Sequence, residues 1–265
     1  MQRILSFRPA FVAARPTRRA VVAISFSVSP PPNPTNTTTF SQYCRSFTMS
    51  QKPQEPTITR VSDLPTQDAK WVTLQKVEYV DQVGKPRVWE VASRKTRSKT
   101  GAGIDAVAMG NILLHPSKPP STLIVIQYRP PHDAYTIEWP AGLIDANETP
   151  EEAAVREFKE ETGYECKVLD ISPVQAADPG LSSANMVMAM VEVNLKEGDE
   201  EPEQRLEDGE HIQRVVVPLS ELYEKLVEYS KRERHIVAAK LFHFAAGMEF
   251  ARNQKYGIWP EDDKK

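Results

Sequence analysis

The sequence is poor in the residues that build covalent or metal-stapled scaffolds. Only two of its 265 residues are cysteines, Cys44 and Cys166, so the chain cannot form a disulfide framework or a cysteine-rich zinc cluster. Its five histidines are scattered without the spacing of metal ligands. The apolar run at 20–24 is too short to span a bilayer, which takes roughly 20 apolar residues. We therefore expect no membrane partner.

The sequence also has no surplus of basic residues. Lys and Arg number 33 against 36 Asp and Glu, which gives a net charge of −3 and a pI near 6.0. Nucleic-acid binding relies on clustered positive charge, so no nucleic-acid partner is expected. With 40% hydrophobic residues the chain can bury a substantial core, in one or two domains, and is long enough to be an enzyme.

The first 50 residues contain no Asp or Glu but several arginines among many Ser, Thr and Ala. This composition favours a mitochondrial transit peptide, and a disordered basic tail is the alternative. Met49 follows shortly before the first acidic residue, Glu55. We hypothesise that initiation at Met49 gives a cytosolic form. Proline-rich segments extend the expected disorder, so residues 1–66 are interpreted as a disordered N-terminal segment.

Order is expected to begin near Trp71. Segments 71–80 and 87–94 read as two strands around a turn at Gly84, which together predict an antiparallel hairpin. A lone hairpin cannot bury both of its faces, so it should pack against another subunit or the following domain. Trp71 and Trp89 are interface core residues or stacking platforms; the residues alone favour core, because buried aromatics are common.

Further segments typical of strands are 104–109, 122–128, 168–175, 186–193 and 211–217. Residues 220–253 have helical periodicity, with Leu222, Leu226 and Ile236 on apolar faces, and carry no evident chemistry. Arg129 stands at a strand end before two prolines, where it either binds a phosphate or forms a structural salt bridge. Strands alternating with a helix and closed by a C-terminal helix predict a mixed α/β sheet with helices on both faces.

The most informative stretch is the short helix expected between Thr149 and Gly163. Thr149 is a good N-cap, and Glu152 three residues later completes a capping box. Pro150 suits the first helical position, and Gly163 can close the helix in a left-handed conformation. Glu157, Glu160 and Glu161 then share one face. Their mutual repulsion is relieved by a hard divalent ion such as Mg²⁺ or Mn²⁺, and a solvated acidic face is the alternative.

The run from Gly142 to Tyr164 resembles the Nudix box at every fixed position. The matches are Gly142, Glu148, Arg156, Glu157, Glu160, Glu161 and Gly163, with Phe158 and Tyr164 in the apolar slots. Beyond the box, residues 70–257 resemble the ADP-ribose pyrophosphatase branch of that family. The motifs that carry this resemblance are KWVTLQKVEYVD, GKPRVWEVASRKTR, QYRPP, EWPAGLID, DPGLS and EDGEHIQ.

The resemblance implies a Nudix α/β/α sandwich and a small N-terminal antiparallel β-domain that is exchanged in a homodimer. The implied divisions are 67–103 for the N-terminal β-domain, 104–257 for the Nudix domain and 258–265 for a tail. It implies hydrolysis of ADP-ribose to AMP and ribose 5-phosphate, with two or three Mg²⁺ ions or Mn²⁺. Other ADP-sugars, oxidised nucleoside diphosphates, or a non-catalytic sensor role are the alternatives; intact box carboxylates disfavour the last.

The resemblance also implies roles for individual residues. The metal ligands are the Ala141 carbonyl and the carboxylates of Glu157 and Glu161, with Glu160 close by, and Arg156 anchors the glutamates. Trp71 and Trp89 become clamps for adenine, one from each subunit. Arg94 and Arg129 would contact the diphosphate or ribose, and Glu138 would lie near the adenosine. Glu210 lies in the acidic loop 196–210, which otherwise reads as a solvated linker, and would handle the catalytic water.

Overall fold

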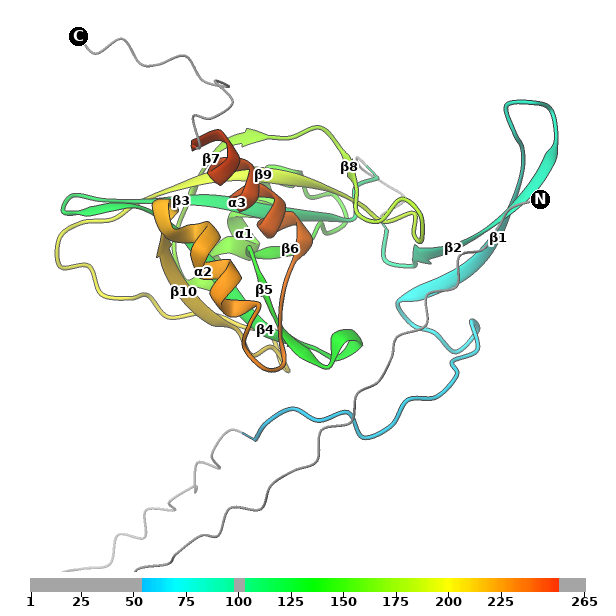
Figure 1. Ribbon diagram of the computed structural model, residues 1–265, viewed down its shortest axis with the longest axis horizontal. Helices are drawn as coiled ribbons and strands as arrows, with labels where there is room; N and C mark the ends of the chain where they lie inside the picture. Colours follow the sequence, from blue (N-terminus) through cyan, green and yellow to red (C-terminus); the bar gives the residue numbers. More distant parts are fainter. Residues whose placement is uncertain (1–53, 98–102, 253–265) are drawn as a thin grey trace, which may run out of the picture. The chain divides into compact units, whose positions relative to one another are not determined.

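The computed structural model describes residues 54–97 and 103–252, all of which belong to one compact unit beginning at Pro53 (Figure 1). The expected transit peptide, Cys44, the alternative start at Met49 and the 258–265 tail lie outside the described residues. Within the described ranges no helix is both long and apolar enough to cross a membrane.

A mixed sheet forms the centre of the fold, as expected. In the described part of the chain it has nine strands, in the order β11-β5-β4-β3-β9-β7, with β10 on β4, β6 on β3 and β8 on β9. Pairing of β3 with β9 is parallel, whereas β4 pairs antiparallel with β5 and β10. The strands are β3 Ala106–His115, β4 Lys118–Arg129, β5 Ala134–Glu138, β6 Ala141–Leu143, β7 Lys167–Ile171, β8 Gln175–Ala176, β9 Asn185–Asn194, β10 Gln213–Pro218 and β11 His235–Val237.

Helices cover both faces of this sheet (Figure 1). They are α1 Pro150–Thr162, α2 Leu222–Tyr229 and α3 Ala239–Arg252, with short 3₁₀ turns η1 Pro130–His132 and η2 Leu219–Glu221. Alternate residues of β4 point to opposite faces, as the period of a strand requires. Leu123 and Val125 join the core under α1, while Ile124 and Ile126 join the core under α2 and α3. The predicted arrangement of helices on both faces is confirmed.

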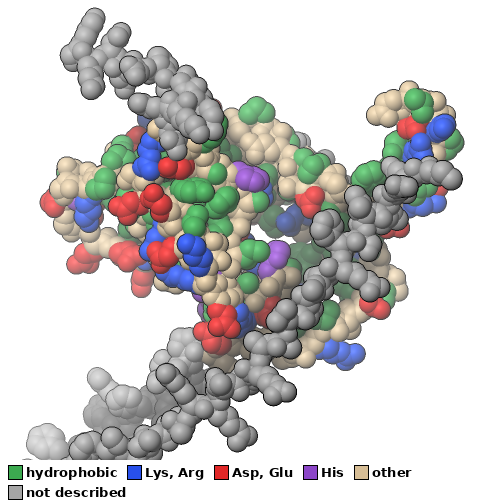
Figure 2. Space-filling model, viewed as in Figure 1, with side chains coloured by type: hydrophobic (Ala, Val, Ile, Leu, Met, Phe, Trp, Pro, Cys, Tyr) green, Lys and Arg blue, Asp and Glu red, His purple; other side chains and the backbone are tan. Residues whose placement is uncertain are grey.

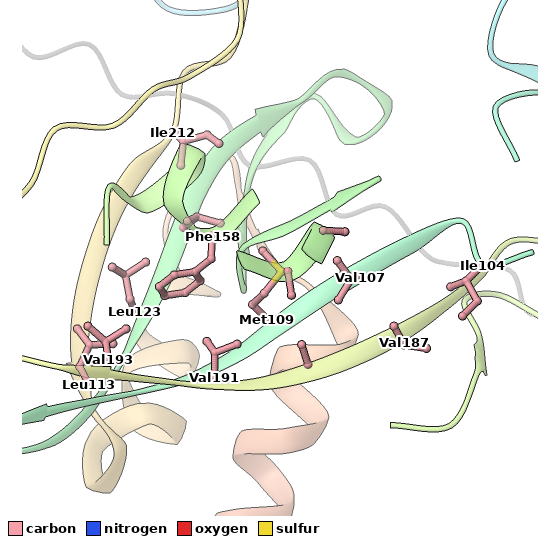
Figure 3. Close-up of a cluster of buried hydrophobic side chains, with 14 residues drawn as sticks. Ile104, Val107, Met109, Leu113, Leu123, Phe158, Val187, Val191, Val193 and Ile212 are labelled. Atoms are coloured by element: carbon pink, nitrogen blue, oxygen red, sulfur yellow. The ribbon is translucent and has the colours of Figure 1, made fainter. Parts of the chain in front are cut away.

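The core under α1 centres on Phe158, which is fully buried. Figure 3 shows its ring among Met109, Leu123 and Val191, which come from three different strands. Because Phe158 lies between Glu157 and the Glu160–Glu161 pair, packing of its ring fixes the rotation of the helix about its axis. The acidic face of α1 is thereby held in one orientation.

The N-terminal hairpin is present, with β1 Val72–Val80 paired in register with β2 Pro86–Arg94. Gly84 has φ +79° in its turn, as expected of a left-handed position. The hairpin also contacts the loop at 178–183: Ala92 N–H donates to the Leu181 carbonyl at 3.0 Å, and Trp89 Nε1 donates to the Gly180 carbonyl at 3.2 Å. The boundary expected at 103/104 falls between β2 and β3 and stays a prediction.

Three details differ from the sequence prediction. The strand expected over 168–175 is interrupted at 172–174, where Pro173 lacks a backbone N–H, and is divided into β7 and β8. Strand β6 was not predicted. The C-terminal region is not wholly helical: Ile236 lies in β11, 42% exposed, so its assignment to an apolar helix face was wrong. Its β-branched side chain and that of Val237 suit a short edge strand, and β5 supplies the partner.

Candidate active site

Helix α1 is fixed at both ends by its own sequence. The Thr149 hydroxyl accepts from Glu152 N–H at 3.2 Å, and the Glu152 carboxylate accepts from Thr149 N–H at 2.8 Å, which is the predicted capping box. At the other end Gly163 has φ +78°, and a Cβ there would lie 2.6 Å from the Glu203 carbonyl oxygen. Glycine is therefore required at 163 both for its conformation and for space.

The acidic face of α1 carries two carboxylates that are costly to ionise. Glu161 is 5% exposed, and burial, opposed by a hydrogen bond from Ala141 N–H, raises its pKa to about 8. Burial also raises the pKa of Glu157, in spite of its ion pair with Arg156. Repulsion from Glu210 acts on both carboxylates in the same direction. A cation placed among them would stabilise their ionised forms.

Gly142 determines where the Glu157 carboxylate lies. A Cβ on residue 142 would lie 1.9 Å from the carboxyl carbon of Glu157, far inside van der Waals contact. Strand β6, which contains Gly142, is held on β3 by the pairing of Val107 with Gly142 and of Ala108 with Ala141. The backbone of β6 and the carboxylate of α1 can therefore approach each other only because residue 142 has no side chain.

Arg156 holds the remaining box carboxylates. Its Nε and Nη2 each donate to Glu148 at 2.8 Å, and Nη1 lies 2.9 Å from Glu157 and 3.3 Å from Glu160. Nη2 also donates to the Leu143 carbonyl at 3.1 Å. The i,i+4 pairing of Arg156 with Glu160 is confirmed. One guanidinium thus joins the start of the box, strand β6 and the acidic face of α1.

The donor set fits a divalent metal. Within residues 54–97 and 103–252, no three His, Cys, Asp or Glu side chains converge as a ready-made metal cage. A magnesium site does not need one, because the ion keeps several waters and takes one or two carboxylates together with substrate phosphates. Glu157 and Glu161 supply hard oxygen donors, and Ala141, whose N–H donates to Glu161 at 3.1 Å, lines the same cavity. Burial, with repulsion from neighbouring carboxylates added to it, raises the pKa of both carboxylates, and a metal ion would stabilise their ionised forms.

A cavity of about 500 Å³ opens over this acidic face. It is lined by eight of the eleven residues that the sequence assigned to the site: Arg94, Arg129, Ala141, Arg156, Glu157, Glu160, Glu161 and Glu210. Residues that sequence reasoning missed also line it, among them Asn185, Met186, Glu207 and Lys240. No pattern marked Lys240, which the sequence placed in a region without chemistry.

Arg129 and Glu138 form an ion pair at the end of β4 and β5. Arg129 Nε donates to Glu138 at 2.8 Å and Nη2 at 3.3 Å, and the Thr136 hydroxyl also donates to this carboxylate. Glu138 itself does not line the cavity. The structural salt bridge considered for Arg129 is therefore present, yet the guanidinium has five N–H donors and also reaches the cavity wall. Arg129 can therefore form the structural salt bridge and still contact a phosphate.

The acidic loop before β10 is tied to α1 and is more than a solvated linker. Gln204 Nε2 donates to the Glu161 carbonyl at 2.6 Å, and Arg205 N–H donates to the Glu160 carbonyl at 2.9 Å. These bonds satisfy carbonyls that the last turn of a helix leaves free. The loop then turns so that Glu207 N–H donates to the Glu210 carboxylate at 3.0 Å. Two loop carboxylates are thereby added to the cavity.

Neither tryptophan reaches the cavity within this chain. Trp71 is 58% exposed and Trp89 is 50% exposed, and both lie on the hairpin. Neither residue is buried within the chain, so a core role would require a subunit interface, which stays a prediction. Their indole rings are open to a ligand or to a second subunit, and the adenine clamp stays a prediction.

Comparisons with known proteins agree with this geometry. A family model described as NUDIX domain matches residues 105–239. An uncharacterised Nudix hydrolase of Schizosaccharomyces pombe is 41% identical over 76% of this chain and 96% of its own length. An ADP-ribose pyrophosphatase of Saccharomyces cerevisiae is 36% identical, covering 77% of this chain and 89% of its own. An ADP-sugar pyrophosphatase of Mus musculus is 33% identical, covering 72% of this chain and 87% of its own.

Arg156 holds the box carboxylates, and the mixed sheet lies between helices. Together with the extent of these matches, this shows that the chain belongs to the Nudix hydrolase family.

Proposed function

We propose that this enzyme hydrolyses the diphosphate of ADP-ribose to AMP and ribose 5-phosphate, and so clears free ADP-ribose. The observation that carries the proposal is the single cavity in which the carboxylates of α1 and of the acidic loop accompany Arg94 and Arg129. Such a cavity offers oxygen donors for divalent ions and guanidinium groups for phosphate oxygens. The yeast and mouse relatives, named for ADP-ribose and ADP-sugars, support the same substrate class.

Each of the site residues has a separate role in this proposal. Glu157, Glu161 and the Ala141 carbonyl would hold Mg²⁺ ions, two or three in number, with Glu160 close by; Mn²⁺ is the alternative. Bound divalent ions neutralise the diphosphate and make hydroxide available near neutral pH. Arg156 keeps the glutamates in place through its four contacts. Arg94 and Arg129 orient the diphosphate.

Glu210 is proposed to accept or steer the proton of the attacking water. It lines the cavity together with Glu157 and Glu161, and its charge adds to burial, the main cause, in raising the pKa of both carboxylates, so it lies close to the acidic face of α1. A general base of this kind contributes typically 10²–10⁴-fold to the rate. Glu138 accepts two hydrogen bonds from Arg129 and so fixes the orientation of its guanidinium group.

The alternative is a broader hydrolase of ADP-sugars or oxidised nucleoside diphosphates. The name of the mouse relative favours this reading, and so does the position of the tryptophans, which would recognise adenine without setting what lies beyond the diphosphate. A non-catalytic sensor is a weaker alternative, because Glu148, Glu157, Glu160 and Glu161 are all present.

A homodimer formed through the N-terminal hairpin is part of the proposal. Hydrophobic side chains, green in Figure 2, lie at the surface of the hairpin. Among them Leu74 is 70% exposed and Val88 is 59% exposed, and a monomer would leave both in contact with water. A partner hairpin covering this surface would also bring Trp71 and Trp89 of two subunits toward one adenine. Localisation to mitochondria, with a cytosolic form starting at Met49, is proposed from the N-terminal composition.

The test is a substrate panel assayed with Mg²⁺ and with Mn²⁺. ADP-ribose, an ADP-hexose, an oxidised nucleoside diphosphate and a dinucleotide are compared by kcat/KM, and the products are identified. ADP-ribose is expected among the best substrates, giving AMP and ribose 5-phosphate. Glu157→Gln should abolish turnover while ADP-ribose binding partly persists. If ADP-ribose ranks last in the panel, the substrate assignment is withdrawn and the family assignment remains.

A further inference from the structure

Lys240 has no role in any pattern that the sequence analysis singled out. It lies one residue beyond the part of the chain matched by the family model, which ends at residue 239. The structure nevertheless places it on the wall of the active-site cavity. We propose that Lys240 is a substrate-binding residue whose ammonium group contacts the diphosphate of the nucleotide substrate, and this rests on the proposed function.

The position of Lys240 is set by strand β11. This strand pairs in parallel with β5, with Val237 beside Ile137, and Ala238 N–H donates to the Ile137 carbonyl at 2.9 Å. The chain therefore enters α3 next to Glu138, the last residue of β5. Lys240 is the second residue of α3. Although burial acts to raise the pKa of Glu138, hydrogen bonds from Arg129 and Thr136 and the charges of Arg129 and Lys240 hold that pKa below its usual value, so Lys240 lies near Glu138. Arg129, Glu138 and Lys240 thus lie near one another at one end of the sheet.

The cations of the cavity differ in whether they are already paired. Arg94, Arg129 and Lys240 line the cavity, and of these Arg129 pairs with Glu138 at 2.8 Å. Arg129 already pairs with Glu138 through two hydrogen bonds, whereas neither Arg94 nor Lys240 has an ion-pair partner among the described residues. A diphosphate diester carries two negative charges near neutral pH. Lys240 and Arg94 together match that charge, and both line the cavity that the box carboxylates line.

Lys240 is not committed to an ion pair within the protein. Among residues 54–97 and 103–252 no carboxylate lies within 4.0 Å of its ammonium group. Its side chain is exposed, so the ammonium stays hydrated and can exchange water for a phosphate oxygen at small cost. The first turn of α3 contains no acidic residue, and a cation there is opposed by the helix dipole. A cation that weakens its own helix and lacks an internal partner is suited to binding a ligand.

A structural role is the competing explanation. Lys240 could act only by keeping Glu138, and through it Arg129, in place. The two roles differ in what the ligand must carry. A phosphate contact matters only for ligands with phosphates, whereas a displaced Glu138 would weaken every ligand that uses this end of the cavity, adenosine included.

The experiment uses the full-length protein with Lys240→Met and Lys240→Arg, and with Lys231→Met as the matched control. Lys231 is exposed, has no described side-chain partner and does not line the cavity. Dissociation constants of ADP-ribose, ADP and adenosine are measured by calorimetry without divalent metal, and KM and kcat for ADP-ribose are measured with Mg²⁺. Thermal melting checks that each variant is folded.

Lys240→Met is expected to weaken ADP-ribose and ADP binding about 10-fold, the order of one charge-assisted hydrogen bond, and to leave adenosine binding unchanged. KM should rise while kcat changes little, and Lys240→Arg should restore most of the loss. Lys231→Met should match the wild type. Unchanged binding of ADP-ribose in Lys240→Met, or an equal loss for adenosine, would overturn the proposal.

The proposed function and this inference fail separately. If the wild type cleaves ADP-ribose and Lys240→Met keeps the wild-type KM, the inference fails alone. If the wild type cleaves none of the substrate panel but Lys240→Met selectively loses ADP binding, the proposed reaction fails and the phosphate contact stands.

Discussion

Replacing Gly142 with alanine should stop catalysis without unfolding the protein. The added Cβ would lie 1.9 Å from the Glu157 carboxyl carbon and 2.2 Å and 2.3 Å from its two oxygens. Ordinary carbon–carbon contact is about 3.5–4.0 Å, so one of the two groups must move by roughly 1.5–2 Å. The Glu157 side chain is the softer of the two, because Gly142 is fixed by the pairing of β6 with β3.

Moving Glu157 takes a predicted metal ligand away from its place and disturbs the 2.9 Å ion pair with Arg156. A displacement of about 1 Å in an active site can cost on the order of 10²-fold in rate, so kcat for ADP-ribose should fall at least that far. The melting temperature should change little, because the side chain that moves is polar and ends at a cavity.

Gly247→Ala is the matched control. Gly247 lies within α3, and a Cβ there meets no heavy atom within 4 Å, so the variant should keep wild-type kcat and gain up to about 1 kcal/mol of stability from helix propensity. Wild-type turnover in Gly142→Ala would refute the reasoning, since the clash with Glu157 is its only premise. Equal losses in both variants would refute it as well.

Three further perturbations test the packing and the electrostatics. Phe158→Ala removes the fully buried ring between α1 and the sheet, and chemical denaturation should show a loss of about 3–5 kcal/mol. Asp105 is buried and pairs with Arg97 at 2.6 Å. Burial acts to raise the pKa of Asp105, but the ion pair with Arg97 and a hydrogen bond from Asn185 N–H hold this pKa below its usual value. Asp105→Asn should therefore cost about 2 kcal/mol at pH 7. The difference from the wild type should begin to close as pH falls below about 4, where the carboxylate of the unfolded chain takes up a proton, and should vanish only below the lowered folded-state pKa of Asp105, where both states are protonated. Mg²⁺ at about 100 times its Kd should stabilise the wild type by about 2.7 kcal/mol. In thermal melts Glu161→Gln should lose most of this stabilisation. Equal stabilisation of both proteins would show that Glu161 is not a metal ligand.

Features that depend only on residues close together in the sequence were predicted well. The ends of α1 depend on Thr149, Glu152 and Gly163, all within or next to the helix, and the structure contains each expected contact. The hairpin around Gly84 is equally local. The sharing of one face by Glu157, Glu160 and Glu161 follows from helical spacing alone. These features needed no knowledge of the rest of the chain.

Features that depend on distant partners were missed or came only from the family resemblance. Strand β11 is three residues long and exists because β5 offers a parallel edge about a hundred residues earlier, which no local pattern reveals. Lys240 was missed for the same reason. Glu210 was assigned by resemblance only, since a carboxylate in an acidic loop looks like any other until Gln204 and Arg205 are seen bound to α1.

The two halves of the site have different structural origins, which bears on how specificity can change. The carboxylate half is built on one helix and the adjoining strand β6, so its geometry survives changes elsewhere in the sheet. The cationic half depends on strand registers: Val125 beside Glu138 places the ion pair, and Val237 beside Ile137 places Lys240. The acidic loop with Glu210 depends on a third register, Gln213 beside Ile126. A one-residue change in the β11–α3 connection would rotate Lys240 away from the cavity and leave the carboxylates untouched. Substrate preference can therefore vary while the hydrolytic chemistry is kept.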